Sequence, residues 1–222
     1  MSKTKTKTKT KDSQEKADNL TEEDLNQDLN EDSDSNSQDS SNLEEFSYEL
    51  KIPEERVAVL IGTEGKTKKE IEENSECKLE ISKEGDVQIT SDDGLKLYTA
   101  KEIVRAVGRG FNPKTALQLL KPDYALEIMD LSEMAGKNKN ILQRLKGRVI
   151  GTGGKSREEI ERLTETEISV YGKTASIIGE TANASMARRA LGMLLEGAMH
   201  RTVYRFLEKQ RKEMIFGAGA KF

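Results

Sequence analysis

The amino-acid sequence predicts an α+β fold in which one module occurs twice, and three observations lead to this prediction. Leu60–Thr67 resembles Val149–Ser156, which lies 89 positions later. Both segments are flanked by short stretches in which apolar and polar residues alternate, as they do in half-buried strands. Between these stretches, apolar residues recur at the three- and four-residue spacing of amphipathic helices. The economical explanation is a duplicated unit of strands and helices.

The first copy is predicted to follow the order strand, helix, helix, strand, strand, helix. Phe46–Ile52 alternates as a strand, and Pro53 both ends that strand and begins a helix over Glu54–Ile61. After a glycine loop, the predicted elements are a helix over Lys66–Asn74, strands over Cys77–Ile81 and Val87–Ile89 with a turn at Gly85 and Asp86, and a helix from about Leu97 that Gly108 caps.

The second copy is predicted to repeat this order and to add one helix. Its elements are a strand over Tyr124–Ile128, a helix that ends near Ile150, the loop Gly151–Gly154, a helix over Lys155–Thr164, strands over Ile168–Val170 and Ser176–Ile178 around a turn at Gly172 and Lys173, and a helix from about Ala182 to Gly197. The additional helix, roughly His200–Met214, has a packing stripe of Val203, Phe206, Leu207 and Met214.

Composition divides the chain near residue 46. The first 45 residues hold six of the 36 basic and thirteen of the 40 acidic residues, so the rest of the chain carries 30 basic and 27 acidic groups. A stretch so polar and charged predicts disorder. We therefore expect a disordered acidic tail at 1–45, a first domain at 46–112, a linker at 113–123, a second domain at 124–199 and a C-terminal helix and end at 200–222. Because the linker is short, the two domains are expected to dock together.

A nucleotide-binding P-loop is excluded although Gly154, Lys155 and Ser156 imitate its end. The glycine that the P-loop motif requires five residues before Gly154 falls on Val149, and in the first copy it falls on Leu60. The single Cys77 and the single His200 provide no metal-ligand cluster and no nucleophile with its base. We therefore expect a protein that is not an enzyme and binds no cofactor and no metal.

The motif Ile-Gly-x-x-Gly-Lys between two helices, within this order of elements, resembles the KH domain of type I in both copies. The resemblance implies a three-stranded antiparallel sheet covered by helices on one face, and a loop that holds single-stranded RNA by its backbone. In the second copy the implied contacts are Arg148, Ile150, Gly151, Thr152, Gly153, Gly154, Lys155, Ser156 and Arg157. In the first copy the implied secondary contacts are Gly62, Thr63, Gly65, Lys66 and Lys68.

The two copies are not expected to bind RNA equally well. Glu64 occupies the loop position at which the second copy has Gly153, and its carboxylate would face the phosphate. Between Lys137 and Lys155 the chain has six basic and no acidic residues, an electrostatic footprint for phosphates around the second loop. The apolar groove floor of that copy is expected from Val149 and Ile150 at the end of the helix and from the strand Ile168–Val170. For Val149, Ile150, Ile160 and Val170, a role in the core is the first expectation.

A narrower resemblance covers about 46–222. The segment Gly108–Leu120 and the Tyr124–Leu131 stretch after it resemble the archaeal and eukaryotic family of two-KH small-subunit ribosome assembly factors, partners of the endonuclease that matures the rRNA 3′ end. The resemblance implies that this chain binds single-stranded pre-rRNA near that end. We also expect a cytoplasmic monomer without a membrane segment.

Other interpretations remain open at this point. A KH fold can serve as a protein-interaction scaffold, and KH modules also occur in general RNA-processing and degradation factors. Salt dependence separates an RNA clamp from an apolar protein interface, because only phosphate contacts weaken as ionic strength rises. The acidic tail is either a solubilising extension or a mimic of nucleic acid that occupies the basic surface.

Overall fold

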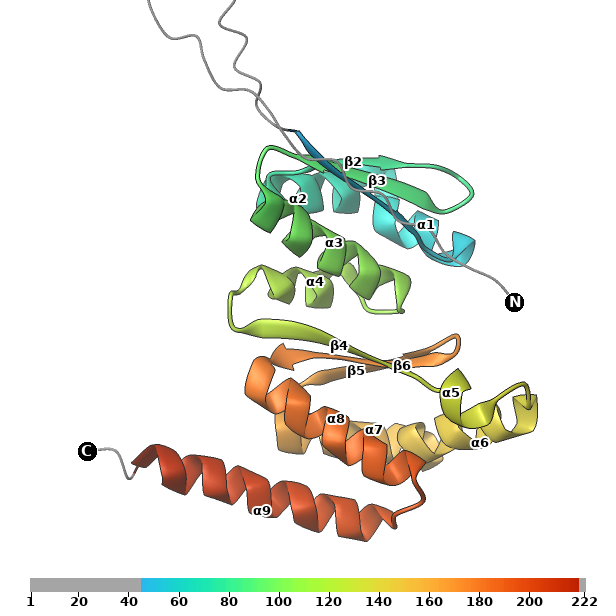
Figure 1. The fold of residues 1–222 in the computed structure, drawn as a ribbon, viewed down its shortest axis with the longest axis vertical. Helices are drawn as coiled ribbons and strands as arrows, with labels where there is room; N and C mark the ends of the chain where they lie inside the picture. Colours follow the sequence, from blue (N-terminus) through green and yellow to red (C-terminus); the bar gives the residue numbers. More distant parts are fainter. Residues whose placement is uncertain (1–44, 220–222) are drawn as a thin grey trace, which may run out of the picture. The chain divides into compact units, whose positions relative to one another are not determined.

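The computed structural model describes residues 45–219, and their side chains as far as residue 214. The acidic tail expected at 1–45 therefore lies outside the described residues, apart from Glu45. The first copy consists of β1 (Phe46–Lys51), α1 (Glu54–Ile61), the 3-10 turn η1 (Thr63–Gly65), α2 (Lys66–Ser75), β2 (Lys78–Ile81), β3 (Asp86–Ser91) and α3 (Gly94–Gly108). Figure 1 shows its helices on one side of its sheet.

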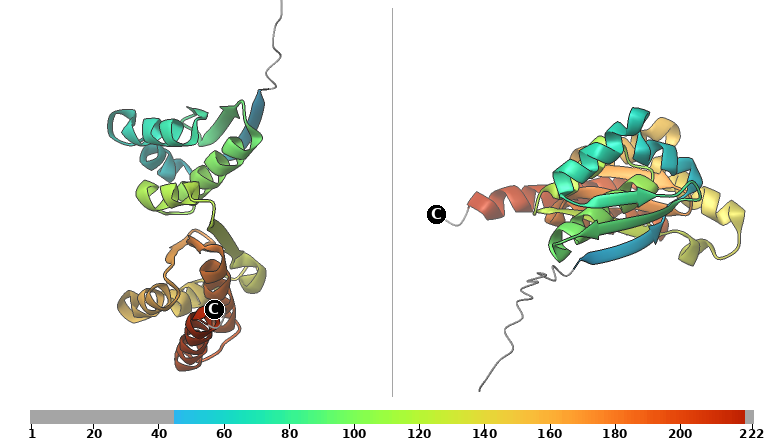
Figure 2. Two further views of the ribbon diagram at one scale, coloured as in Figure 1. Left: turned by 90° about the vertical axis from the view of Figure 1, so that its left-hand side faces the viewer. Right: turned by 90° about the horizontal axis from the view of Figure 1, so that it is seen from above.

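The connection and the second copy follow in the same arrangement. The connection consists of α4 (Pro113–Ala116) and the 3-10 turn η2 (Leu117–Leu120). The second copy consists of β4 (Tyr124–Asp130), α5 (Ser132–Ala135), α6 (Lys139–Ile150), the 3-10 turn η3 (Thr152–Gly154), α7 (Lys155–Thr164), β5 (Glu167–Tyr171), β6 (Thr174–Glu180) and α8 (Thr181–Leu195), and α9 (His200–Gly219) ends the described chain. The two perpendicular views of Figure 2 show α9 beside the other helices of this copy.

Each copy has one antiparallel three-stranded sheet in which the last strand lies in the middle. The strand orders are β1-β3-β2 and β4-β6-β5. In the first sheet Leu79 faces Ile89, and in the second Ile168 faces Ile177, so the same inward pairs recur in both. These four side chains are buried beneath the helices. The predicted α+β class and the KH-type order of elements are confirmed.

Gly108 does not cap α3, contrary to the prediction. It is the last helical residue and is buried, and a Cβ atom there would lie 2.8 Å from the Ile52 Cγ2 atom. The positive φ of 98° falls on Gly110, where a Cβ atom would lie 2.7 Å from the Ser169 hydroxyl oxygen. Gly108 is therefore needed because Ile52, which follows β1, packs directly against it. Gly110 is needed because Ser169 of the second copy lies against it.

The 113–123 linker is packed, because it contains the turns α4 and η2, whose Ala116 and Leu119 are buried in the hydrophobic cluster of the first copy. Two further details differ from the predictions. The short helix α5 was not predicted. On α9, Val203 and Leu207 are buried as expected and Phe206 is half-buried, but Met214 is 44% exposed, because that part of the helix extends beyond its packing partners.

The outer faces of the two sheets differ because only one of them is covered. In β6, Ser176 and Ile178 are fully buried, and Ile178 packs in the hydrophobic cluster of the first copy beside Tyr124 and Leu126. The Ser169 hydroxyl donates to the Arg109 carbonyl at 2.9 Å across the same contact. Residues 45–219 accordingly belong to one compact unit, as the short linker predicted.

Replacing Ile178 with Thr is expected to lower the free energy of unfolding by roughly 2 to 4 kcal/mol, because it removes buried apolar volume and buries a hydroxyl group. Thr90 occupies the corresponding position of β3, one residue after the inward Ile89, and it is half-buried. The reverse change Thr90→Ile is the matched control and should alter stability by less than about 0.5 kcal/mol. Thermal unfolding of both variants measures this, and equal losses would contradict the difference between the faces.

Within residues 45–219, no helix combines the length and the apolar character needed to cross a membrane.

Candidate nucleic-acid interface

The two glycine loops have the same backbone conformation. Gly62 and Gly151 have φ values of 71° and 73°, and Gly65 and Gly154 have φ values of 73° and 83°. At the third loop position, which is Glu64 in the first copy and Gly153 in the second, the φ values are also positive. These left-handed conformations turn the chain from one helix directly into the next, and they favour glycine. The duplicated motif therefore corresponds to a duplicated backbone shape.

The first glycine of each loop is required by what lies beneath it. A Cβ atom on Gly151 would lie 2.5 Å from the Ser156 Cβ atom, and one on Gly62 would lie 2.2 Å from the Thr67 hydroxyl oxygen. Ser156 is only 3% exposed. The structure places it under the loop, where a small side chain is needed, and its contact with RNA stays a prediction.

The loops differ in the residue at their third position, which is exposed in both copies. Glu64 has a φ of 55° and Gly153 a φ of 62°, and a Cβ atom on Gly153 would meet nothing within 4 Å. A side chain in the left-handed region costs about 1 to 2 kcal/mol. The first copy keeps the loop conformation in spite of this cost. The loops therefore differ in charge and not in backbone shape.

The lysines that follow the two loops have different partners. In the first copy the Lys66 ammonium group lies 3.5 Å from the Glu64 carboxylate, and both side chains are mainly exposed. Lys155 is also exposed, but among the side chains described for residues 45–214 it forms no ion pair. The cation of the second loop is thus available to an external anion, whereas the cation of the first loop faces its own carboxylate.

Arg148 was predicted to contact RNA, but its guanidinium group holds the end of α8. It donates to the Leu194 carbonyl at 2.8 Å and to the Ala198 carbonyl at 2.6 Å. Arg56 does the same in the first copy, donating to the Val107 and Phe111 carbonyls at 2.9 and 2.6 Å. The Val107 and Leu194 carbonyls lie in the last turns of α3 and α8, where the i+4 amide partners of a helix are missing. The Phe111 and Ala198 carbonyls follow three residues after the ends of these helices.

The two arginines with this shared role are not aligned in the sequence repeat. With the offset of 89, Arg148 corresponds to Val59 and not to Arg56, which lies almost one helical turn earlier. The equivalence therefore depends on where each side chain reaches in space. This is why the sequence comparison did not reveal it.

A second pair of predicted contacts is also engaged within the fold. The Arg157 Nε atom lies 3.5 Å from the Glu161 carboxylate, and the Lys68 ammonium group lies 3.7 Å from the Glu72 carboxylate. Glu161 also accepts the Ile168 amide at 2.7 Å, as Glu72 accepts the amide of Leu79 at 2.8 Å.

The repeated glutamate therefore joins the second helix of each copy to the following strand. Burial raises the pKa of the Glu161 carboxyl group, although the Ile168 hydrogen bond and Arg157 oppose the shift. Arg157 and Lys68 keep partly exposed side chains, but their charges are already partly balanced.

The apolar residues beside the second loop divide into two groups. Val149 and Ile160 are fully buried and belong to the core, for which the sequence already made them candidates. Ile150, at the end of α6, and Val170, on β5, are only half-buried. Their open apolar surfaces can support nucleotide bases, which stack or rest on such surfaces in single-stranded complexes.

The remaining predicted contacts lie at the surface of the loops. Thr152, Gly153 and Lys155 are exposed, and Gly151 and Gly154 are half-buried. In the first copy Thr63 and Lys66 are exposed, and Gly62 and Gly65 are half-buried. The basic run before the second loop is also accessible, and within residues 45–214 none of the following takes part in an ion pair: Lys137, Lys139, Arg144 and Lys146.

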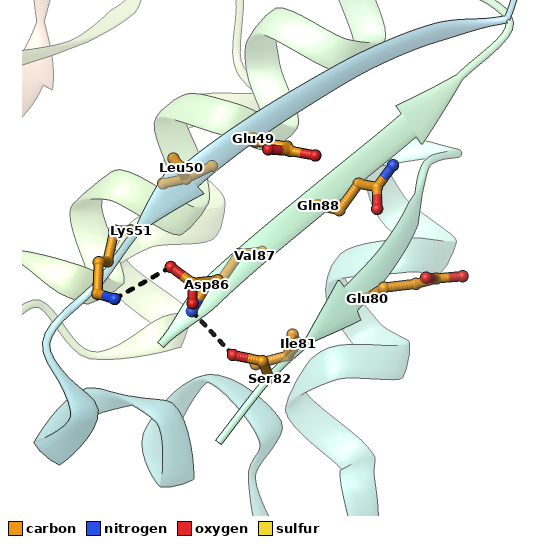
Figure 3. A pocket seen from close by; sticks show the side chains of 9 residues that line it. All are labelled: Glu49, Leu50, Lys51, Glu80, Ile81, Ser82, Asp86, Val87 and Gln88. Atoms are coloured by element: carbon orange, nitrogen blue, oxygen red, sulfur yellow. Dashed lines mark hydrogen bonds and ion pairs between the residues drawn. The ribbon is translucent and has the colours of Figure 1, made fainter. Parts of the chain in front are cut away.

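A hollow of about 620 Å³ on the first sheet has the opposite charge. Figure 3 shows Glu49, Glu80 and Asp86 around it, with Lys51 as the cation. The Lys51 ammonium group is paired with the Asp86 carboxylate at 3.2 Å. Such a surface repels a phosphate backbone. The candidate nucleic-acid interface is therefore the second loop with Ile150 and Val170.

The comparisons with known proteins agree with this site. Residues 125–212 match a family model described as a eukaryotic-type KH domain of type I, the second KH domain of PNO1. Residues 47–106 match the general KH domain model. Both copies are thus recognised independently of one another.

Relatives match a larger part of the chain. A KH domain-containing protein of Methanocaldococcus jannaschii is 48% identical over 169 residues, which is 74% of each chain. The pre-rRNA-processing protein PNO1 of Chaetomium thermophilum is 30% identical over 151 residues, 62% of this chain and 58% of that protein. The crystal structure of an a/eIF2alpha-aDim2p-rRNA complex from Pyrococcus horikoshii contains a chain that is 41% identical, with a TM-score of 0.72 and coverage of 78% of this chain and 97% of that one. The chain belongs to the family of two-KH-domain proteins that includes PNO1 and Dim2p.

Proposed function

We propose that this protein binds single-stranded RNA during assembly of the small ribosomal subunit, and that it holds pre-rRNA near its 3′ end through the Gly151–Gly154 loop. The observation that carries the proposal is the exposed loop with three glycines in positive φ, followed by a lysine that has no ion pair among residues 45–214. The relatives support the choice of RNA, since one is named for pre-rRNA processing and another was crystallised with rRNA.

The loop can hold a phosphate without any chemical step. Gly153 and Gly154 have no bulky side chain, so the strand can approach the backbone closely. The first amides of α7 point their partial positive charge toward the loop, and Lys155 adds a full charge. Bases of the same strand would lie on Ile150 and Val170. About four nucleotides fit such a groove in KH domains.

The test of this function is the binding of a single strand with the sequence of the small-subunit rRNA 3′ region, measured by fluorescence anisotropy at several salt concentrations. We expect the logarithm of the affinity to fall linearly with the logarithm of the salt concentration. The same strand in a perfect duplex, whose bases are not accessible, should bind less tightly. Equal affinity for strand and duplex would contradict the proposal, and salt-independent binding to a partner protein with no RNA affinity would favour a scaffold.

Changing Gly153 to Glu gives the second loop the composition of the first, and we expect it to reduce RNA affinity about 3- to 5-fold at low salt. The backbone should remain intact because Glu64 already adopts this conformation. The matched change Glu64→Gly should raise or leave unchanged the affinity of the full chain. If Glu64→Gly weakened binding while Gly153→Glu did not, the second copy would not be the principal site.

The wider role is part of the same proposal. The endonuclease that matures the 3′ end is the expected protein partner, the chain is expected to act as a cytoplasmic monomer, and the role requires no catalytic group of its own. We place the turns α4 and η2 with the first domain, since their apolar side chains pack in its cluster. Deleting 1–45 tests the role of the acidic tail. If the tail is a mimic of nucleic acid, its removal should raise RNA affinity at low salt. If it is a solubilising extension, its removal should leave the affinity unchanged.

A further inference from the structure

A hollow of about 430 Å³ lies between the second glycine loop and the first turn of the C-terminal helix α9. We call it the α9 hollow. It is lined by Arg144 of α6, by Thr152 and Lys155 of the loop and α7, and by His200 and Tyr204 of α9. Neither Ile150 nor Val170 lines it. It is therefore separate from the apolar surface on which bases are proposed to lie.

The chemistry of the α9 hollow suits an anion with several oxygen atoms. No Asp or Glu is among its lining residues, whereas Arg144 and Lys155 are exposed cations that form no ion pair among residues 45–214. Tyr204 and Thr152 add hydroxyl groups that can donate. Gly147, which also lines the hollow, has nothing within 4 Å of the Cβ position, so no side chain closes it there.

Hydrogen bonds hold the two sides of the hollow together. The His200 Nε2 atom lies 2.9 Å from the Arg148 carbonyl oxygen, and because a carbonyl only accepts, Nε2 is the donor. The guanidinium group of the same Arg148 binds the carbonyls of Leu194 and Ala198 just before α9. The start of α9 is thus bound to the end of α6, and a ligand would not have to order these elements.

A buried hydroxyl group gives an independent indication of a ligand. Ser156 belongs to the lining and is only 3% exposed, and its hydroxyl oxygen has no hydrogen-bond partner among the described residues. A buried polar group without a partner is costly. An acceptor oxygen bound beside the first turn of α7 would satisfy this hydroxyl and would also meet the positive end of the helix.

We propose that the α9 hollow binds a phosphodiester group of the RNA strand, next to the nucleotides that the groove holds. This inference rests on the proposed function and adds the path of the strand, which would pass over the loop toward α9. The strand is favoured as the source of the phosphate because Gly151, Thr152 and Lys155 belong both to the loop and to the hollow. A strand held by the loop therefore reaches the hollow without a further connection.

The test compares two RNA strands on the full chain. One has about four nucleotides, which the groove alone accommodates, and the other is roughly twice as long and extends past the loop. Arg144→Gln should weaken the longer strand about 3- to 10-fold and leave the shorter one unchanged. Tyr204→Phe removes a donor without removing a charge and should show the same length dependence to a smaller extent.

Lys139→Gln is the matched control, because it removes one exposed positive charge from the same helix outside the hollow. It should weaken both strands equally and only slightly. If Arg144→Gln also weakened both strands equally, its charge would act at a distance and the site would be refuted. A second outcome would also overturn the proposal. If inorganic phosphate shifted the His200 ring resonances while Arg144→Gln showed no dependence on strand length, the hollow would be a site for a free anion and not for the RNA strand.

The two proposals fail in different ways. If the unchanged protein bound neither strand, the proposed function itself would fail. If the unchanged protein bound both strands and Arg144→Gln changed neither affinity, only the α9 hollow would fail.

Discussion

Replacing Gly153 and Gly154 together with Asp is expected to lower the affinity for single-stranded RNA about 10- to 100-fold at low salt. Each substitution places a carboxylate where a phosphate is proposed to lie, and each such repulsion costs on the order of 1 kcal/mol. The loop has room for the side chains, because a Cβ atom on Gly153 meets nothing within 4 Å and one on Gly154 meets only the Glu158 carboxylate at 3.5 Å. Fluorescence anisotropy with the 3′-region strand measures the loss.

The control is the double change to Asn at the same positions. Asn has the size of Asp and tolerates positive φ equally well, but it has no charge. It should retain most of the affinity, and both double variants should unfold at nearly the same temperature. If Asn abolished binding as thoroughly as Asp, then steric access and not charge would decide. A larger effect of Asp at Thr63 and Glu64 would reverse the order of the two copies.

Replacing Arg148 with Ala is expected to lower the free energy of unfolding by about 2 to 4 kcal/mol. The change removes two charge-assisted hydrogen bonds and leaves the carbonyls of Leu194 and Ala198 without them. The His200 hydrogen bond should persist, because its acceptor is the main-chain carbonyl of residue 148, which Ala retains. Thermal or denaturant unfolding of the full chain measures the loss.

Two matched variants separate this structural role from a role in RNA binding. Arg56→Ala removes the corresponding bonds in the first copy and should destabilise by a similar amount. Arg144→Ala removes an exposed arginine from the same helix as Arg148 and should change stability by less than about 0.5 kcal/mol. If Arg148→Ala reduced RNA affinity without reducing stability, the original prediction that it contacts phosphate would hold.

The elements of the fold could be predicted because each has a local cause. The position of Pro53 determines the end of β1 and the start of α1, and the structure agrees with both. The alternation in Phe46–Ile52 correctly predicts a strand, but Phe46 and Tyr48 are 42% and 40% exposed, so most of this strand is not half-buried as predicted. The loop glycines were found because positive φ restricts the residue type in each copy independently. Such local signals survive without knowledge of the rest of the molecule.

One prediction failed because the role of the residue depends on a distant part of the chain. Gly108 has the type of a helix cap, but Ile52, 56 positions earlier, requires its lack of a side chain. No local pattern reports this contact, since it joins elements that the fold brings together. The burial of Ser156 has a local cause instead, because Gly151 lies on it only five positions away.

By itself, the sequence determined that the chain is a duplication, that each copy has the KH order of elements, and that the second loop is the stronger candidate for RNA. These conclusions depend on residue type, spacing and charge, which act within one turn or one strand. Only the tertiary structure decided which cations remain available to a ligand. The Arg148 guanidinium group donates to main-chain carbonyls 46 and 50 positions later, and no local pattern reports these contacts. Arg157 and Lys68 have their carboxylate partners four positions later on the same helix, and only the distances of 3.5 and 3.7 Å show that these ion pairs form.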